Sequence, residues 1–154
     1  MNTSDITKLL HQREPYLMVS EITECDQKKI IAKKIFSGEE FFLKGHFPDA
    51  PVVPGAMIQE FCTQSAGILI SKYHSPVENY NSKSTKGHAL GVLRKVNYAK
   101  FISIVKPTDF IECEVELEEK IENLFHFKAR VIQNSQVMAK IGFTLTNISD
   151  DHLI

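Results

Sequence analysis

The second half of the chain alternates between apolar and polar residues in a way that predicts β-strands. In the stretch 110–117 glutamates occupy every second position from 112 onward, which places one strand face in water and the other in a core. Two-residue hairpin turns are expected at Glu122-Asn123 and Asn134-Ser135. The four strands expected in this half are residues 90–104, 109–120, 124–133 and 136–147.

The first half predicts one short helix and two strands. Residues 3–12 have apolar side chains at helical spacing, with Ser4 or Asp5 as the expected N-cap. Residues 16–25 and 29–37 are rich in Ile and Val, as strands usually are.

A second helix is expected from Pro54-Gly55 to about Lys72, and its apolar side chains cover nearly every direction. A helix of this kind is normally buried. Residues 39–54 contain three prolines and should be irregular, residues 74–86 are expected to form a polar surface loop, and His88 is expected where the next strand starts.

Two strands, one buried helix and four further strands predict an α+β fold. We expect one domain over residues 1–154, an antiparallel sheet wrapped around a central helix.

Composition and charge exclude several classes of function. The 18 Lys and Arg residues nearly balance 19 Asp and Glu residues, so the net charge of −1 offers no general attraction to nucleic acid or to an anionic membrane. The longest apolar run, residues 66–70, is too short to span a bilayer. Three widely spaced cysteines without a CxxC pair predict neither a disulfide framework nor a zinc site. With no signal peptide evident, these features suit a reducing cytoplasm.

Glu60 is a carboxylate inside the otherwise apolar helix, next to Phe61 and Cys62. Desolvation raises the pKa of such a group, and a carboxyl group that stays protonated near neutral pH can act as a general acid. Gln64 follows one turn later and is placed to hydrogen-bond the carboxyl group. The spacing alone also fits an alternative, in which Glu60 lies at the helix surface beside a subunit boundary.

His46 lies in the tightly directed loop Gly45-His46-Phe47-Pro48. A neutral imidazole there can accept a proton near pH 7, although a histidine that only braces the loop fits the pattern too. Gly55 begins the buried helix, where free backbone N–H groups suit a developing oxyanion, or where the chain simply needs a small residue. His46 and Glu60 make an acid–base pair if the fold brings them together.

The segment from Gly45 to Gly67 resembles the (3R)-hydroxyacyl-[acyl-carrier-protein] dehydratases of type II fatty acid synthesis. It fits the family pattern GHFPxxPxxPGxxxxExxxQxxG without a gap. Residues 10–19 resemble the family's LPHRYPFLLV opening, and residues 96–101 with 107–109 resemble its IDKARF…PGD strand and turn. The resemblance covers about residues 6–147 and implies the hotdog fold, a sheet curled around one long helix.

The resemblance also implies a chemistry. His46 would remove a proton from C2 of a 3-hydroxyacyl thioester, Glu60 would protonate the departing 3-hydroxyl group, and the Gly55 amide would polarise the thioester carbonyl. Phe47, Pro54 and Gln64 complete the expected substrate-binding residues. The His of one subunit would meet the Glu of its partner, in a dimer or a trimer of dimers, without a cofactor or metal.

The implied substrate is attached to the phosphopantetheine arm of an acidic acyl carrier protein. The basic residues around Arg94 and Lys100 offer a surface for such a partner, although single basic clusters also suit solvated strand edges. Two rivals share the fold: an acyl thioesterase, which usually lacks the GHFP loop, and a non-catalytic protein that binds an acyl chain or its carrier.

Three positions depart from the family pattern. Tyr98 stands where lysine is usual, Thr108 replaces the glycine of PGD, and Glu14 precedes a proline where an aromatic residue is commoner. The acid–base pair is unaffected, so these changes fit a dehydratase of a specialised acyl pathway. A related dehydratase/isomerase carries aspartate at the position of Glu60, which argues against isomerase activity.

Overall fold

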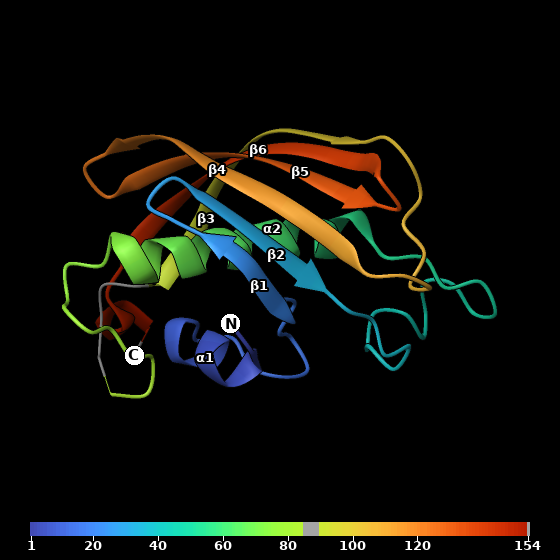
Figure 1. The fold of residues 1–154 in the computed structure, drawn as a ribbon, viewed down its shortest axis with the longest axis horizontal. Coiled ribbons are helices and arrows are strands. Elements are labelled where there is room, and N and C mark those ends of the chain that lie inside the picture. The colour runs from blue at the N-terminus through green and yellow to red at the C-terminus, as the bar shows by residue number, and fades with distance from the viewer. Residues whose placement is uncertain (85–89, 154) are drawn as a thin grey trace.

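One long helix lies at the centre of the fold, held inside a curled sheet (Figure 1). The computed structural model of the chain describes residues 1–84 and 90–153. Helix α2 (Gly55–Tyr73) is buried without a break from Phe61 to Ser71. This confirms the buried helix expected from the all-round apolar pattern.

The sheet is antiparallel throughout and has the order β1-β2-β4-β5-β6-β3. Its inner face arches over α2 (Figure 1), and the side chains of Phe61, Phe125, Phe127 and Phe143 are fully buried in the core. The expected hotdog arrangement is therefore confirmed. The strands are β1 (Glu21–Cys25), β2 (Lys29–Lys34), β3 (Leu90–Phe101), β4 (Ile111–Ile121), β5 (Leu124–Gln133) and β6 (Gln136–Ile148).

The last three strands are joined by the two expected hairpin turns. Ile121 pairs with Leu124 across the first turn, and Gln133 pairs with Gln136 across the second. Asn134 and Ser135 have φ angles of 50° and 64°, the left-handed conformation of a type I′ turn. This turn has the twist of the flanking strands, so the hairpin forms although the preferred Asn-Gly pair is missing.

The first expected strand, 16–25, was wrong in its first half, because β1 begins at Glu21. The backbone of residues 16–18 is bound by a side chain of α2 in place of a neighbouring strand. The Met18 N–H donates to Gln64 Oε1 at 2.8 Å, and Gln64 Nε2 donates to the Tyr16 carbonyl at 2.9 Å. Residues 17–19 are buried all the same, which is why their sequence looks like a strand.

Two further strands end earlier than expected. Strand β2 ends at Lys34, short of residue 37, because the N–H groups of Ser37 and Gly38 donate to the Glu40 carboxylate at 2.9 and 3.0 Å. Strand β3 ends at Phe101, short of residue 104.

Helix α1 (Thr3–Leu9) is capped by Asn2, whose Oδ1 accepts from the Asp5 N–H at 3.2 Å, so the expected Ser4 or Asp5 cap was wrong. A short 3₁₀ helix, η1 (Asp150–Leu153), follows β6. Residues 85 and 86 of the expected surface loop, and His88, lie outside the described residues. None of the described helices has the length and apolar character needed to cross a membrane.

Candidate active site

The loop before α2 fixes the orientation of the His46 imidazole. His46 Nδ1 lies 2.8 Å from the Val52 carbonyl oxygen, which can only accept a hydrogen bond. Nδ1 therefore carries the proton, and in the neutral ring Nε2 keeps its lone pair. The Val52 N–H donates in return to the His46 carbonyl at 2.8 Å, which ties the two ends of the loop together. His46 is thus held in the tautomer of a general base acting through Nε2.

The same imidazole lines a hollow of about 360 Å³ at the start of α2. Gly55 lies in its wall, and the hydrogen bonds of the helix begin only with the Met57 and Ile58 N–H groups, which donate to the Pro54 carbonyl. The N–H groups of the first helical residues are left free for a ligand, at the positive end of the helix dipole. The rest of the wall comes from Val52, Val53, Ile58 and residues 101–105, and it is apolar apart from Ser103.

Phe101 explains why the helix begins with glycine. A Cβ atom on Gly55 would lie 3.1 Å from the nearest carbons of the Phe101 ring, closer than ordinary van der Waals contact. The ring therefore rests directly on the helix start. Gly55 thus has a packing role as well as the role expected at an oxyanion.

Glu60 lies on another side of α2, in a network with Gln64 and Tyr16. Gln64 Nε2 donates to Glu60 Oε1 at 2.9 Å, as the one-turn spacing predicted. Burial raises the pKa of Glu60, and the polar side chains of Gln64 and Tyr16 oppose this rise. Glu60 is therefore a partly buried carboxyl group that holds its proton more tightly than an exposed one.

Gln64 can take only one orientation in this network. Its side chain is 1% exposed and contacts the Met18 N–H, which can only donate, and the Tyr16 carbonyl, which can only accept. The amide oxygen must face Met18, so the amide nitrogen faces both Tyr16 and Glu60. Gln64 thus presents a fixed N–H donor to Glu60.

The predicted residues fall into two groups within the chain. His46 and Gly55 share the hollow, whereas Glu60 and Gln64 share the network with Tyr16. Glu60 follows Gly55 by five residues, which turns it by about 140° around the helix axis and moves it about 7.5 Å along it. Among the described residues of one chain, no hydrogen bond joins His46 to Glu60.

Phe47 and Pro54, the other expected substrate-binding residues, support the loop. The Phe47 ring stacks on His46 with 4.3 Å between ring centroids, and its outer face is exposed. Pro54 is the N-cap residue of α2. A direct contact with substrate stays a prediction for both.

Tyr16 is a site residue that the sequence did not indicate. It lies in the stretch expected to form a strand, and its carbonyl meets the Gln64 amide across 48 positions of the sequence. The match of residues 10–19 to the family opening assigns Tyr16 no role.

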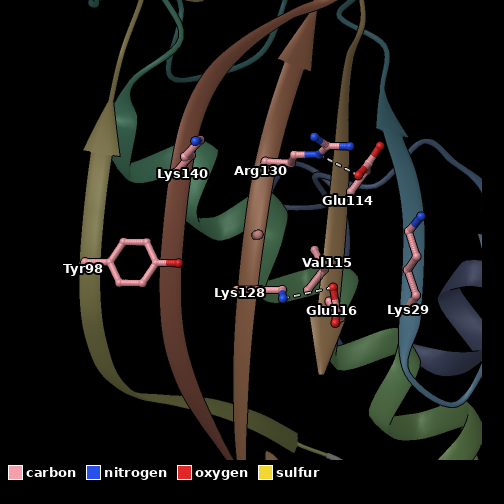
Figure 2. A pocket seen from close by; sticks show the side chains of 9 residues that line it. Lys29, Tyr98, Glu114, Val115, Glu116, Lys128, Arg130 and Lys140 are labelled. Atoms are coloured by element: carbon pink, nitrogen blue, oxygen red, sulfur yellow. Dashed lines mark hydrogen bonds and ion pairs between the residues drawn. The ribbon is translucent and has the colours of Figure 1, made fainter. Parts of the chain in front are cut away.

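A second hollow, of about 380 Å³, crosses the face of the sheet that points away from α2 (Figure 2). Figure 2 shows Tyr98 on β3, cations on β2, β5 and β6, and glutamates on β4. The cations largely pair with the glutamates: Arg130 Nε lies 2.7 Å from Glu114 Oε2, and Lys128 Nζ lies 3.3 Å from Glu116 Oε2. The arrangement is that of a solvated face with cross-strand ion pairs.

Tyr98, one of the departures from the family pattern, has a structural reason. It pairs across strands with Gly142, and a Cβ atom on Gly142 would lie 2.2 Å from the Tyr98 ring. The ring thus covers backbone that only glycine leaves open.

The described residues contain no group of three or more His, Cys, Asp or Glu side chains arranged to hold a metal ion. Cys62 and Cys113 are fully buried between α2 and β4, and the Cys113 thiol donates to Ser65 Oγ at 3.2 Å. They belong to the core, as expected for Cys62.

Known proteins resemble the chain in sequence and in fold. A family model described as FabA-like domain matches residues 10–142. The 3-hydroxyacyl-[acyl-carrier-protein] dehydratase FabZ of Petrotoga mobilis is 32% identical over 140 residues, 91% of this chain and 93% of that protein. The protein of the same name from Caldanaerobacter subterraneus is 34% identical over 148 residues, 94% of this chain and 98% of that protein.

Solved structures agree at the level of the fold. A chain of the dehydratase heterocomplex ApeI:P from Xenorhabdus doucetiae aligns with a TM-score of 0.78 at 14% identity, covering 96% of this chain and 93% of that chain. A hypothetical thioesterase with coenzyme A from Streptococcus pneumoniae aligns with a TM-score of 0.61 at 12% identity, covering 84% and 85%. A dehydratase and a hypothetical thioesterase both have this fold, so the fold alone does not distinguish the two activities.

Proposed function

The chain belongs to the FabA-like domain family and is of the FabZ dehydratase type, and we propose that it converts (3R)-3-hydroxyacyl thioesters to trans-2-enoyl thioesters. The reaction would serve the synthesis of fatty acids or related acyl chains. The observation that carries the proposal is His46, whose Nδ1 bonds to the Val52 carbonyl, so that Nε2 is the base nitrogen of the neutral ring, in a mostly apolar hollow beside the start of α2.

The first half of the reaction is a proton abstraction. His46 Nε2 takes a proton from C2, and the electron pair of that C–H bond moves toward the thioester carbonyl. The free N–H at Gly55 donates to the carbonyl oxygen as negative charge develops there. The mostly apolar wall would lower the polarity around this carbonyl, which strengthens the hydrogen bond.

The second half expels the hydroxyl group. Glu60 gives its proton to the 3-hydroxyl oxygen, the C3–O bond breaks, and a C2–C3 double bond and water form. The raised pKa of Glu60 keeps it protonated at higher pH than an exposed glutamate, as an acid requires. The proton gained by His46 and the proton lost by Glu60 balance, and exchange with solvent resets both groups.

We further propose that His46 of one chain works with Glu60 of a second chain in a dimer. Strand β3 is an edge of the sheet, and it exposes a run of apolar side chains that a soluble edge strand normally avoids. The chain continues from this edge into the wall of the His46 hollow, so a second copy paired there would lie against the site. The exposed apolar residues are Val92, Leu93, Val96, Phe101, Ile102 and Ile104.

The acyl group would be carried by an acidic acyl carrier protein, since the related dehydratases are named for that substrate. Arg94 and Lys100 lie on β3, close in sequence to the residues that line the hollow. We propose that they attract the carrier electrostatically, in which case raising the salt concentration should weaken the reaction with carrier-bound substrate.

An enoyl-thioester absorbance assay, run in the hydration direction with crotonyl and longer enoyl thioesters, tests the function. Wild type should remove the enoyl band, while His46→Ala and Glu60→Gln should leave it unchanged with the fold intact. Thiol release would instead identify the thioesterase, and tight acyl-carrier binding without any spectral change would favour the binding protein. Unimpaired turnover in both variants would reject the acid–base assignment.

A further inference from the structure

We infer that Gln133 is a positioning residue for His46, because its buried amide holds the β3–β4 connection to which the His46 loop is hydrogen-bonded. The β3–β4 connection consists of residues 102–110 and supplies part of the wall of the His46 hollow. The inference rests on the proposed function of His46 as the general base. It concerns a side chain that does not itself line the hollow.

The course of the β3–β4 connection follows from the order of the strands. Strand β3 is an edge of the sheet and β4 lies inside it, with β6 and β5 between them. The connection therefore runs past the hairpin turn that joins β5 to β6 (Figure 1). Gln133 is the last residue of β5 and pairs with Gln136 across this turn. A side chain at the turn is thus placed to hold the crossing backbone.

Gln133 faces inward at a place where the apolar core ends. The inward-facing residues before it in β5 are apolar and buried: Phe125, Phe127, Ala129 and Val131. Gln133 continues this series and is 7% exposed. An amide so well shielded from water needs hydrogen-bond partners within the protein.

Both partners of the Gln133 amide nitrogen are carbonyl groups of the β3–β4 connection. Gln133 Nε2 donates to the Lys106 carbonyl at 2.8 Å and to the Asp109 carbonyl at 3.0 Å. A carbonyl oxygen can only accept, so the amide nitrogen must face the connection. Within the connection, all of which the structure describes, Val105 alone is buried. Packing therefore holds this segment weakly, and its hydrogen bonds matter more.

Hydrogen bonds lead from the β3–β4 connection to the imidazole. Next to Lys106, the Val105 carbonyl accepts from the Val53 N–H at 2.9 Å. Next to Val53, the Val52 carbonyl lies 2.8 Å from His46 Nδ1 and fixes the tautomer of the ring. A shift of the connection would therefore move the acceptor that keeps the proton on Nδ1. The position of the base nitrogen thus depends on where the connection lies.

The test removes the N–H donors of Gln133 and keeps a side chain of similar length. Gln133→Met suits an apolar site, whereas Gln133→Glu keeps the shape of the side chain and, when ionised, has no donor. Tyr73→Phe is the control, because the Tyr73 hydroxyl also donates to backbone, to the Cys25 carbonyl at 2.8 Å, at the other end of α2. Thermal unfolding midpoints check that all three variants fold.

The first readout is the tautomer of the His46 imidazole. The ¹⁵N resonances of its ring are assigned by their disappearance in His46→Ala and are recorded at a pH where the ring is neutral. Wild type should carry the proton on Nδ1. Both Gln133 variants should show a mixture of the two tautomers, because the Val52 carbonyl is no longer held in place, and Tyr73→Phe should match wild type.

The second readout is the rate in the enoyl-thioester assay. We expect kcat to fall by about tenfold in both Gln133 variants, because the base nitrogen is no longer aligned with the substrate. KM should change less than about twofold, since Gln133 does not line the hollow. Tyr73→Phe should keep both constants of wild type.

An Nδ1–H tautomer retained in both Gln133 variants would overturn the inference even if their unfolding midpoints fell, because Gln133 would then serve stability alone. A kcat equal to that of an active wild type, or the same tautomer change in Tyr73→Phe, would overturn it as well. The resonances do not depend on turnover. A wild type inactive toward every enoyl thioester would therefore reject the proposed function, while the tautomer still decided on Gln133.

Discussion

Replacing Gln64 by leucine should cost the protein a measurable part of its stability, because one buried amide joins three parts of the fold. Its oxygen accepts from the Met18 N–H, and its nitrogen donates to the Tyr16 carbonyl and to Glu60. Leucine fills a similar volume but makes none of these hydrogen bonds. The segment before β1 would then lose the bonds that replace strand pairing.

The magnitude follows from the burial of each group. Met18 is 1% exposed, so its N–H would be left without a partner and without water, at a cost of about 1–3 kcal/mol. The Tyr16 carbonyl is only partly buried and can be hydrated, so its loss adds about 1 kcal/mol. Burial of the larger apolar surface of leucine contributes about 1 kcal/mol of stability. We expect a net loss of about 2 kcal/mol in the free energy of unfolding.

Urea unfolding at a fixed protomer concentration measures this loss, with the concentration held constant because the proposed dimer couples folding to association. Gln59→Leu is the control. Gln59 lies on the same helix, its Nε2 donates to Thr63 Oγ1 at 3.1 Å, and its Oε1 is buried with no hydrogen-bond partner among the described residues. This variant should change stability by less than about 1 kcal/mol. A Gln64→Leu protein as stable as wild type would refute the role assigned to the amide.

Three further predictions follow from single contacts. Gly142→Ala should lower the free energy of unfolding by about 1–3 kcal/mol, because the new Cβ would overlap the Tyr98 ring. Adding Tyr98→Ala should restore most of the lost stability in thermal unfolding, and no such rescue would contradict the contact. Gly55→Ala should lower kcat/KM by about tenfold with little change in stability, because the methyl group displaces the Phe101 ring in the hollow. Adding Phe101→Leu should recover part of the activity. A Gly55→Ala protein with the kinetics of wild type would rule out this crowding. Burial raises the pKa of Glu60 above its usual 4.5, so its contribution to stability is complete below pH 4.5 and is lost as the pH rises through the raised value. Glu60→Gln should therefore gain stability relative to wild type between pH 4 and pH 7 in urea unfolding, and a difference independent of pH would disprove the linkage.

The sequence alone predicted the elements whose structure depends on a local pattern of apolar and polar residues. The alternation in β4 and the all-round apolar pattern of α2 reflect burial directly, so these elements lie within a residue or two of their expected bounds. The i, i+4 spacing also predicted the contact between Glu60 and Gln64, because a helix fixes that distance.

Other features depend on contacts between distant parts of the chain. Residues 16–19 carry the composition of a strand, yet Gln64 binds their backbone across 46 and 48 positions of sequence. No local pattern indicates these contacts. Asn2 caps α1 although Ser4 and Asp5 have equal propensity for that place, because capping depends on where the helix begins.

If His46 and Glu60 act together across two chains, mixed dimers of two inactive variants should recover activity. His46→Ala and Glu60→Gln are unfolded together, refolded in equal amounts and assayed for loss of the enoyl band, with His46→Ala mixed with the double variant as the control. Random pairing makes half of the dimers mixed, each with one intact site of two, so we predict about one quarter of wild-type activity. No activity above that of the control would contradict a site shared between two subunits.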